Sequence, residues 1–282
     1  MIWPFKPRYR KQVARIEISG AIASATRKRV LEALEEVEEK KFPALLLRID
    51  SPGGTVADSQ EIFSALRRLQ DKVKIVASYG NISASGGVYI GVGAHHIVSN
   101  PGTITGSIGV ILRGNNIEKL LERVGVSFKV IKSGPYKDIL AFDRALTPAE
   151  ETILQELIDV SYGQFVRTVA EGRNLSEESV REFADGRVFT GEQALALGMV
   201  DRLGTEEDAR RWAAELGGLD PEKAECYTFE EKKPLISKLL PGNQSAFDIF
   251  PKHMPATMAR LDFEVATSGV PLWLYQPPMM VK

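Results

Sequence analysis

Ser85 stands where its side chain could act as a nucleophile. A run typical of a strand, residues 73–79, leads toward it, and small and apolar residues typical of a buried helix follow it. A serine at a sharp turn from strand to helix exposes its Oγ, and the N–H groups beside it point toward whatever that oxygen attacks. Gly86 and Gly87 would let a substrate carbonyl approach the main chain. The stretch therefore indicates attack on a carbonyl carbon, although a glycine-rich helix start packed under a sheet has the same pattern.

A serine nucleophile needs a base, and histidine is the usual one. The chain contains three histidines, His95, His96 and His253. The first two precede a predicted short strand and have the spacing of packing residues, while the third lies in a proline-rich region. None of them stands in a motif with a recognisable orienting carboxylate, so the sequence argues against a Ser–His–Asp triad.

The elements that must position Ser85 alternate between strand and helix. Residues 14–18 alternate between apolar and polar types, which is the period of a half-buried strand, and residues 26–40 carry apolar positions at helical spacing. Residues 44–49 form a nearly continuous apolar run, as expected of a central parallel strand covered on both faces. A second helical pattern, the strand over residues 73–79 and the helix after Ser85 follow. This order predicts an α/β fold with right-handed crossovers and a mostly parallel sheet flanked by helices.

The chain after this unit also has patterns of regular structure. Short strands are predicted at residues 96–99 and 128–131. Thr147, Pro148 and Glu150 have the types expected of an N-cap, a first helical position and the closing residue of a capping box, so a long helix should begin there. Shorter helices are predicted over residues 176–184, 191–197 and 206–216.

The composition is that of an ordinary globular protein. The 282 residues are 44% hydrophobic and 26% charged, and a chain of this length can bury a sizeable core. The formal net charge of −1 provides no field that would attract nucleic acid. A single cysteine, Cys226, excludes an internal disulfide and fits a reducing compartment. No apolar run approaches the roughly 20 residues of a membrane span, so we expect a cytoplasmic protein.

Two terminal segments differ from the domain between them, which we place at residues 13–230. Residues 1–12 form a basic and aromatic leader without the apolar core of a signal peptide. We expect this leader to be flexible, and the alternative is that it contacts an anionic membrane surface. Residues 231–282 contain seven prolines and should form an extended tail. Residues 270–275 are too apolar to remain in water, so we expect them to dock on the chain's own domain or on a neighbour.

Three short motifs occur in order along the chain. They are Ser51-Pro52-Gly53-Gly54, Ala84-Ser85-Gly86-Gly87 and Lys132-Ser133-Gly134-Pro135-Tyr136-Lys137-Asp138. With two later strings, residues 185–191 and 197–201, they resemble the signal peptide peptidase A family of serine peptidases. The resemblance covers about residues 16–201, and it implies the Clp-protease/crotonase fold.

The resemblance also implies a Ser/Lys dyad, with Ser85 as nucleophile and Lys137 as general base. A lysine takes the serine proton only when it is neutral, and burial favours the neutral form, so we expect a dry site walled by apolar groups. Asp138 should face away, because its charge would favour the ammonium. Ser107 matches a family serine that hydrogen-bonds the lysine amine and aims it, although a turn serine bonded to its own backbone fits the sequence nearly as well.

The main-chain N–H groups of Gly54 and Gly86 are the expected oxyanion donors. One lies at a glycine-rich strand end and the other directly after the nucleophile. If the turn is rotated, the N–H of Gly53 is the oxyanion donor in place of the N–H of Gly54. Ser83 is the alternative nucleophile, but it stands two residues before Ser85 and lacks a glycine pair behind it.

By resemblance, we expect a serine endopeptidase that hydrolyses signal peptides and other short, unfolded, hydrophobic peptides through an acyl-enzyme. The family uses no metal or nucleotide cofactor. Its half-length members form octameric rings or domes, in which Lys137 would act either in its own subunit or on a neighbour's serine. Family members commonly carry an N-terminal membrane anchor and we find none here, so any membrane contact should be peripheral. Two other classes share the fold, a non-hydrolytic acyl-CoA binder and a scaffold without catalysis, and neither needs both Ser85 and Lys137.

Overall fold

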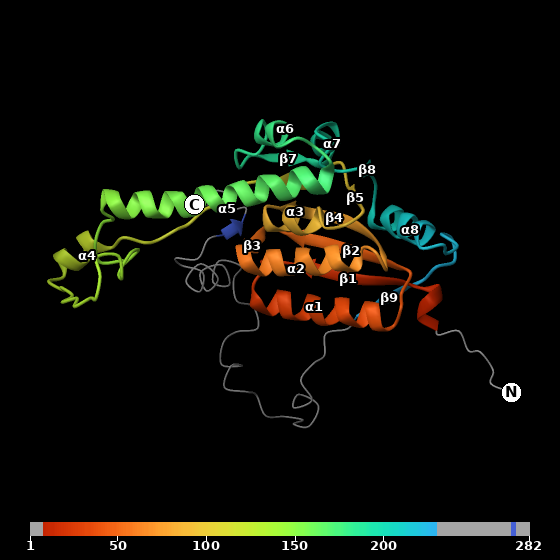
Figure 1. The fold of residues 1–282 in the computed structure, drawn as a ribbon, viewed down its shortest axis with the longest axis horizontal. Coiled ribbons are helices and arrows are strands. Elements are labelled where there is room, and N and C mark those ends of the chain that lie inside the picture. The colour runs from red at the N-terminus through yellow and green to blue at the C-terminus, as the bar shows by residue number, and fades with distance from the viewer. Residues whose placement is uncertain (1–7, 230–271, 275–282) are drawn as a thin grey trace, which may run out of the picture.

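A mostly parallel β-sheet forms the centre of the structure, a computed structural model that describes residues 8–229 and 272–274 (Figure 1). Among the strand pairs of this sheet, β6 and β7 are antiparallel and the others are parallel. The predicted α/β arrangement is therefore confirmed. Along the main path the strands lie in the order β7 (Val188–Thr190), β6 (Ile104–Gly106), β4 (Lys74–Ala84), β2 (Ala44–Ser51), β1 (Val13–Ser19) and β9 (Cys226–Thr228), while β5 (His96–Ser99) pairs with β4 and β8 (Arg202–Leu203) pairs with β5.

Helices cover both faces of this sheet, which explains the continuous apolar run of β2. Leu45 belongs to the core that α1 (Ser24–Glu39) and α2 (Val56–Leu69) cover. Leu46, whose side chain points the opposite way, belongs to a second core with α8 (Glu206–Leu216). Because both faces are buried, neither set of alternating residues has to be polar.

β4 continues to Ala84, beyond the predicted end of the strand at residue 79. Its second half pairs with β6 and with the end of β2, so small and polar residues there have backbone partners. The strand leads directly into α3 (Gly86–Gly91), all of whose residues are buried. Ser85 is therefore held between a central strand and a core helix.

The long helix α5 (Pro148–Arg173) begins with the predicted capping box. The Thr147 hydroxyl accepts a hydrogen bond from the Glu150 N–H, and the Glu150 side chain accepts one from the Thr147 N–H. The C-terminal half of the helix is anchored on the body by buried residues such as Phe165 and Val169. Its N-terminal half extends beyond the body (Figure 1).

Residues 111–160 form a projecting arm, which comprises the chain around α4 (Glu118–Arg123) and the N-terminal half of α5 (Figure 1). The strand predicted at residues 128–131 is wrong, because these residues have no strand structure in the described chain. Their apolar side chains lie on the arm without a neighbouring strand to pair with. Most of the exposed large apolar side chains of the described residues belong to this arm: Ile111, Ile117, Leu120, Val124, Val126, Phe128, Val130, Ile131, Tyr136, Phe142, Ile153, Leu157 and Val160.

The end of the chain returns to the domain, as one of the two sequence-based alternatives expected. β10 (Leu272–Leu274) pairs in an antiparallel sense with β3 (Gly53–Thr55). Most of the predicted leader and tail lies outside the described residues, so the proposed domain limits stay predictions. Tyr9 is described, and its ring packs against Phe42 with ring centroids 5.4 Å apart.

The remaining elements are short and lie at the periphery of the sheet. The helix predicted over residues 176–184 is the shorter helix α6 (Glu177–Arg181), and the one predicted over residues 191–197 is α7 (Gly191–Ala196). A 3-10 helix, η1 (Arg8–Lys11), precedes the first strand. None of the helices within residues 8–229 is long and apolar enough to cross a membrane.

Candidate active site

The backbone of Ser85 forms the sharp turn expected between strand and helix. Its φ of 53° and ψ of −114° lie in a region that residues with a Cβ rarely adopt. The turn is held on both sides, because the Ser85 N–H donates to the Gly106 carbonyl at 2.8 Å and the Ser85 carbonyl accepts from the Tyr89 N–H at 3.0 Å. Such strain is typical of a nucleophile-bearing turn at the head of a helix, but the Oγ of Ser85 is buried and not exposed as the sequence led us to expect.

The hydroxyl of Ser85 is buried and has no hydrogen-bond partner among the described residues. The residue is only 1% exposed. Ser83 also has a buried hydroxyl without a described partner, but it lies within β4 in register with Ser51, and it has no positive φ. The strained turn therefore distinguishes the two serines and favours Ser85 as the nucleophile.

The Ser-Pro-Gly-Gly motif brings a second set of main-chain donors to the same place. Gly53 has a φ of 103°, and its N–H donates to the Ser51 hydroxyl at 3.1 Å. Ile22 bonds to both the Gly53 carbonyl and the Thr55 N–H. Since successive residues of a strand point their polar groups to opposite edges, the N–H of Gly54 points away from Ile22. The N–H of Gly53 is thus engaged by Ser51, whereas Gly54 faces the edge of β3 at which it pairs with residue 273 of β10.

This role of Ser51 was not foreseen from the sequence. A hydroxyl two residues before a glycine is a common way to hold a turn, and that spacing was the available signal. Gly54 is required for a different reason, because a Cβ there would lie 1.9 Å from the Ile22 carbonyl oxygen. Ser51 and Gly54 together therefore fix the path of β3 close to the main chain of the preceding loop.

The candidate donors and the nucleophile meet at the carboxyl ends of β2 and β4. Ser51 pairs with Ser83 across these strands, and β3 lies against α3. Gly86 is the first residue of α3, where an N–H has no partner within the helix. The carboxyl edge of a parallel sheet is the usual place for a ligand in α/β folds. The structure thus brings Ser85, Gly54 and Gly86 together.

Ser107 lies beside this group. It follows Gly106, whose carbonyl accepts the Ser85 N–H, and it has a φ of 51° and an exposure of 8%. Its N–H donates to the Arg187 carbonyl at 2.7 Å. Ser107 therefore follows directly after the residue whose carbonyl holds the Ser85 turn, and its role in aiming the lysine amine stays a prediction.

Lys137 is not part of this cluster within a single chain. It is exposed and lies in the projecting arm, and its N–H donates to the Gly134 carbonyl at 3.3 Å. The expected dry pocket around its amine is therefore absent from the described residues of one chain, because the arm extends away from the body. The carboxylate of Asp138 is held by Arg144 at 2.9 Å and by Lys132 at 2.6 Å, which keeps the pKa of Asp138 well below its usual value.

The two described histidines serve packing and lie far from Ser85. His95 Nδ1 accepts the Ile75 N–H at 3.0 Å, and the His96 ring stacks on Trp212 with centroids 4.2 Å apart. Burial lowers the pKa of both histidines. His96 pairs with Val76, and at about 3.3 Å per residue the path along β4 to Ser85 spans roughly 30 Å. His253 lies outside the described residues.

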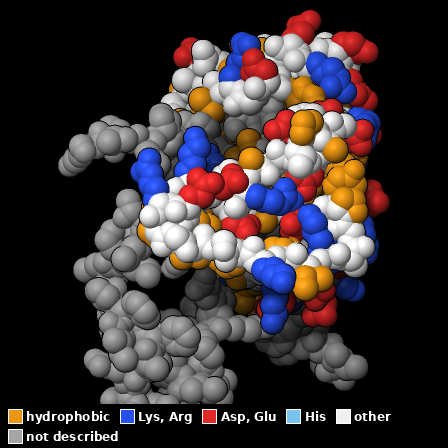
Figure 2. Space-filling model, turned by 90° about the vertical axis from the view of Figure 1, so that its left-hand side faces the viewer, with side chains coloured by type: hydrophobic (Ala, Val, Ile, Leu, Met, Phe, Trp, Pro, Cys, Tyr) orange, Lys and Arg blue, Asp and Glu red, His pale blue; other side chains and the backbone are white. Residues whose placement is uncertain are grey.

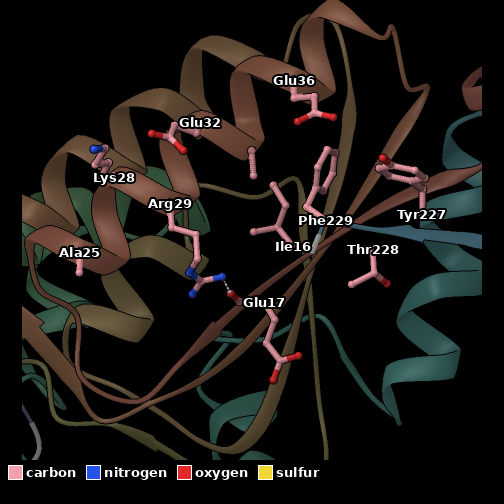
Figure 3. A pocket seen from close by; sticks show the side chains of 11 residues that line it. Ile16, Glu17, Ala25, Lys28, Arg29, Glu32, Glu36, Tyr227, Thr228 and Phe229 are labelled. Carbon is pink, nitrogen blue, oxygen red and sulfur yellow. Dashed lines mark hydrogen bonds between the residues drawn. The ribbon is translucent and has the colours of Figure 1, made fainter. Parts of the chain in front are cut away.

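A hollow elsewhere on the molecule carries no such chemistry. It lies between α1 and the sheet edge formed by β1 and β9, and Figure 3 shows its mixed lining. Arg29 donates to the Glu17 carbonyl at 2.9 Å there, and Glu32 and Tyr227 lie on opposite walls. Among residues 8–229 and 272–274, no group of three His, Cys, Asp or Glu side chains is placed to hold a metal ion. The Ser85 cluster is therefore the candidate site.

Comparison with known proteins gives one family. The profile of peptidase family S49 matches residues 67–220. A protein of Synechocystis sp. named "Putative protease" is 67% identical over 98% of this chain and 100% of its own length. A protein of Enterococcus faecium named "Putative signal peptide peptidase SppA" is 35% identical over 71% of this chain and 62% of its own length.

Solved structures show the same fold at low sequence identity. A variant of the 1510-N membrane-bound stomatin-specific protease has a TM-score of 0.53 and is 18% identical, over 79% of this chain and 99% of that one. A ClpP1 variant from Listeria monocytogenes has a TM-score of 0.50 and is 18% identical, over 70% of this chain and 94% of that one. The predicted Clp-protease/crotonase-like fold is confirmed.

Proposed function

The chain belongs to peptidase family S49 and is a serine peptidase, and from this premise we propose that it cleaves peptide bonds through an acyl-enzyme on Ser85. The observation that carries the proposal is the strained turn with its buried, unpartnered hydroxyl. If the Ser85 Oγ attacks the carbonyl carbon of a bound peptide, the carbonyl oxygen of that peptide becomes negatively charged. This oxygen would lie between the N–H groups of Gly54 and Gly86. Donors fixed in advance at that point stabilise the transition state more than the bound substrate.

Lys137 is the proposed general base, and it would act on the Ser85 of a neighbouring copy. Within one chain Lys137 is exposed on the projecting arm, whereas a lysine base has to be neutral. Burial against a neighbour would favour its neutral form, and the Ser107 beside that serine could receive and aim the amine. The lysine would then return the proton to the leaving amine, and water would hydrolyse the acyl-enzyme in a second step.

Assembly into a closed ring or dome of copies follows from the same arm. Figure 2 views the molecule from the side on which the arm projects, and hydrophobic side chains there lie between clusters of Lys or Arg and Asp or Glu. Exposed apolar side chains are concentrated in residues 111–160, and a surface of this kind marks an interaction site. A second copy would cover it, in line with the octameric assembly expected from the resemblance.

The proposed substrates are short, extended, apolar peptides, including cleaved signal peptides. The edge of β3 that carries Gly54 accepts an extended segment in the antiparallel sense, because β10 lies there. A peptide bound in this manner would place its carbonyl groups near the Gly54 N–H. The name of the Enterococcus faecium relative supports signal peptides as one substrate class. We place the protein in the cytoplasm, with peripheral contact to a membrane surface where such peptides are released.

A mixing experiment tests the shared site. Ser85→Ala and Lys137→Ala, each expected to be inactive alone, are unfolded together at equal concentration and refolded, and peptide hydrolysis is measured. Shared sites regain up to roughly a quarter of wild-type activity, since a random mixture places both intact residues at about that fraction of sites. Sites contained in one chain regain none. A mixture of wild type with the double variant Ser85→Ala/Lys137→Ala calibrates the exchange of subunits, because at equal concentrations shared sites fall from about a half of wild-type activity without exchange to about a quarter with full exchange.

A further inference from the structure

A cluster of charged side chains surrounds the residue next to Lys137. The guanidinium of Arg144 donates to the carboxylate of Asp138 at 2.9 Å and to its carbonyl oxygen at 3.1 Å. Lys132 donates to the same carboxylate at 2.6 Å and to the Pro135 carbonyl at 3.0 Å. The loop that carries Lys137 is therefore tied to one arginine through both the side chain and the main chain of its neighbour.

The other side of this arginine is fixed to the head of α5. Arg144 donates to both carboxylate oxygens of Glu150, at 2.6 and 2.8 Å. Glu150 is 2% exposed and also accepts the Thr147 N–H as part of the capping box. Its carboxylate thus has a defined position at the start of a helix of 26 residues. A planar guanidinium can bridge two carboxylates in this manner, whereas an ammonium cannot match both fork geometries.

We propose that Arg144 is a positioning residue for the reaction: it fixes the Lys137 loop to the head of α5 and, together with Lys132, occupies the carboxylate of Asp138 beside the lysine. The inference rests on the proposed function, in which Lys137 is the base. Arg144 itself would touch neither the substrate nor Ser85.

Two consequences follow from this role, one of geometry and one of charge. A base displaced by about 1 Å loses up to about 100-fold in rate, so a loop freed from Arg144 should lower kcat. Loss of the guanidinium leaves Asp138 paired with Lys132 alone and removes a positive charge near Lys137, which favours the ammonium form that cannot take a proton. The charged groups around the loop are Lys132, Asp138 and Arg144 within it, Glu150 from α5 and Glu118 from α4, which accepts the Ala145 N–H.

The test compares Arg144→Leu with Arg123→Leu, a matched change of an exposed arginine on α4 in the same arm. For Arg144→Leu we expect kcat to fall about 10- to 100-fold with a smaller change in KM. The midpoint of the rise of kcat/KM with pH should move upward, because the loss of the Arg144 positive charge favours the charged lysine. Arg123→Leu should match wild type in both respects, and size-exclusion chromatography should show the same assembly for both variants.

A second substitution separates the charge from the geometry. Adding Asp138→Asn to Arg144→Leu removes one negative charge and so restores the net charge near Lys137, so the pH midpoint should return toward wild type while kcat stays low. If Arg144→Leu does not assemble, Arg144→Gln is measured in its place, since it keeps an amide donor but no charge. A kcat and a pH midpoint equal to those of Arg123→Leu overturn the proposal, and so does an unchanged midpoint in an assembled variant with reduced kcat.

A parallel variant keeps this inference separate from the proposed function. If Lys137→Ala is inactive while Arg144→Leu behaves as the control, only the role of Arg144 is overturned. If Lys137→Ala retains activity, the lysine base is wrong and the role of Arg144 falls with it.

Discussion

At Ser85 a φ of 53° coincides with a buried hydroxyl that has no partner among the described residues. A backbone in such a region costs about 1–3 kcal/mol, and an unpaired buried hydroxyl costs a similar amount. Both destabilising features belong to Ser85, the residue whose hydroxyl is proposed to attack the substrate. The rest of the fold must offset them, through the hydrogen bonds at Gly106 and Tyr89 and through the buried helix α3.

Substitution of Ser85 should therefore separate activity from stability. Ser85→Ala should abolish peptidase activity and labelling by a fluorophosphonate, while the free energy of unfolding in urea rises by about 1 kcal/mol or more, because the unpaired buried hydroxyl is removed. Ser85→Gly should also be inactive but more stable by about 1 kcal/mol, because glycine accepts a positive φ without strain. Ser83→Ala is the control and should keep most of the activity. If Ser83→Ala lost activity while Ser85→Ala kept it, Ser83 would be the nucleophile and the assignment of Ser85 would be wrong.

At the scale of elements, β3 is the part of the site with the least freedom. A Cβ at Gly54 would meet the Ile22 carbonyl oxygen at 1.9 Å, whereas a Cβ at Gly102 has no heavy atom within 4 Å. The first glycine is needed because two segments of main chain approach each other closely. The second lies in a turn with open space, so the pair provides a matched comparison.

Gly54→Ala should destabilise the protein by about 2 kcal/mol or more and displace the proposed oxyanion donor. We expect loss of most of the activity and a lower midpoint in thermal unfolding. Gly102→Ala should change neither by a measurable amount. Full activity of Gly54→Ala would remove its N–H from the proposed site.

The head of α5 makes a pH-dependent contribution to stability. Hydrogen bonds from Arg144 and the Thr147 main chain lower the pKa of Glu150 from 4.5 to about 2. Because the folded pKa is depressed, this contribution is present above about pH 4.5 and is lost as the pH falls toward about 2. Glu150→Gln should therefore lower Tm at neutral pH, and the difference from wild type should narrow as the pH falls below about 4. Glu151→Gln, at the next position of the same turn, is the matched control, because the hydrogen bonds of Arg144 go to Glu150.

Elements with local signals could be predicted from the sequence, and those that depend on distant partners could not. The apolar run of β2 and the capping box of α5 have signals within a few residues, and both predictions are confirmed. Residues 128–131 contain three apolar residues out of four, but a strand also needs a pairing partner, and no described strand pairs with them. The pairing of β10 with β3 joins residues too far apart for any local pattern to indicate it.

The site was predictable to the same extent. The position of Ser85 follows from a local motif, as do the glycines of β3. The contact of Arg144 with Asp138 and Glu150 has no local signature, because each pair is separated by six residues along an irregular segment and the start of a helix. The place of Lys137 relative to Ser85 depends on the direction of the whole arm, which no motif encodes.

For the whole molecule, the arm determines which surfaces are available to other copies. Ile131 is 91% exposed on the arm, whereas Leu195 is 38% exposed on α7. An apolar side chain left so accessible to water is costly unless it is covered in the assembly. Exposure is thus greatest in the segment that carries the proposed base.

Ile131→Asp should weaken assembly and reduce activity in parallel, because the shared sites are lost when the copies separate. Size-exclusion chromatography and peptide hydrolysis should be measured over the same range of protein concentrations. Leu195→Asp is the control and should leave particle size and specific activity unchanged. A smaller particle with full activity would contradict a site built from two chains.

The pairing of β10 with β3 makes the end of the chain a tethered competitor for the peptide-binding edge. A tethered segment is present at a fixed effective concentration, typically in the millimolar range, that dilution does not reduce. A substrate that uses this edge would have to displace Leu272–Leu274, and a competitor of this kind raises KM by the same factor for every such substrate. Removal of residues 270–282 should therefore lower KM for short and long peptides alike, with kcat unchanged. Three residues of the enzyme's own sequence, Leu272–Leu274, would thus raise the peptide concentration that the enzyme needs in order to be active.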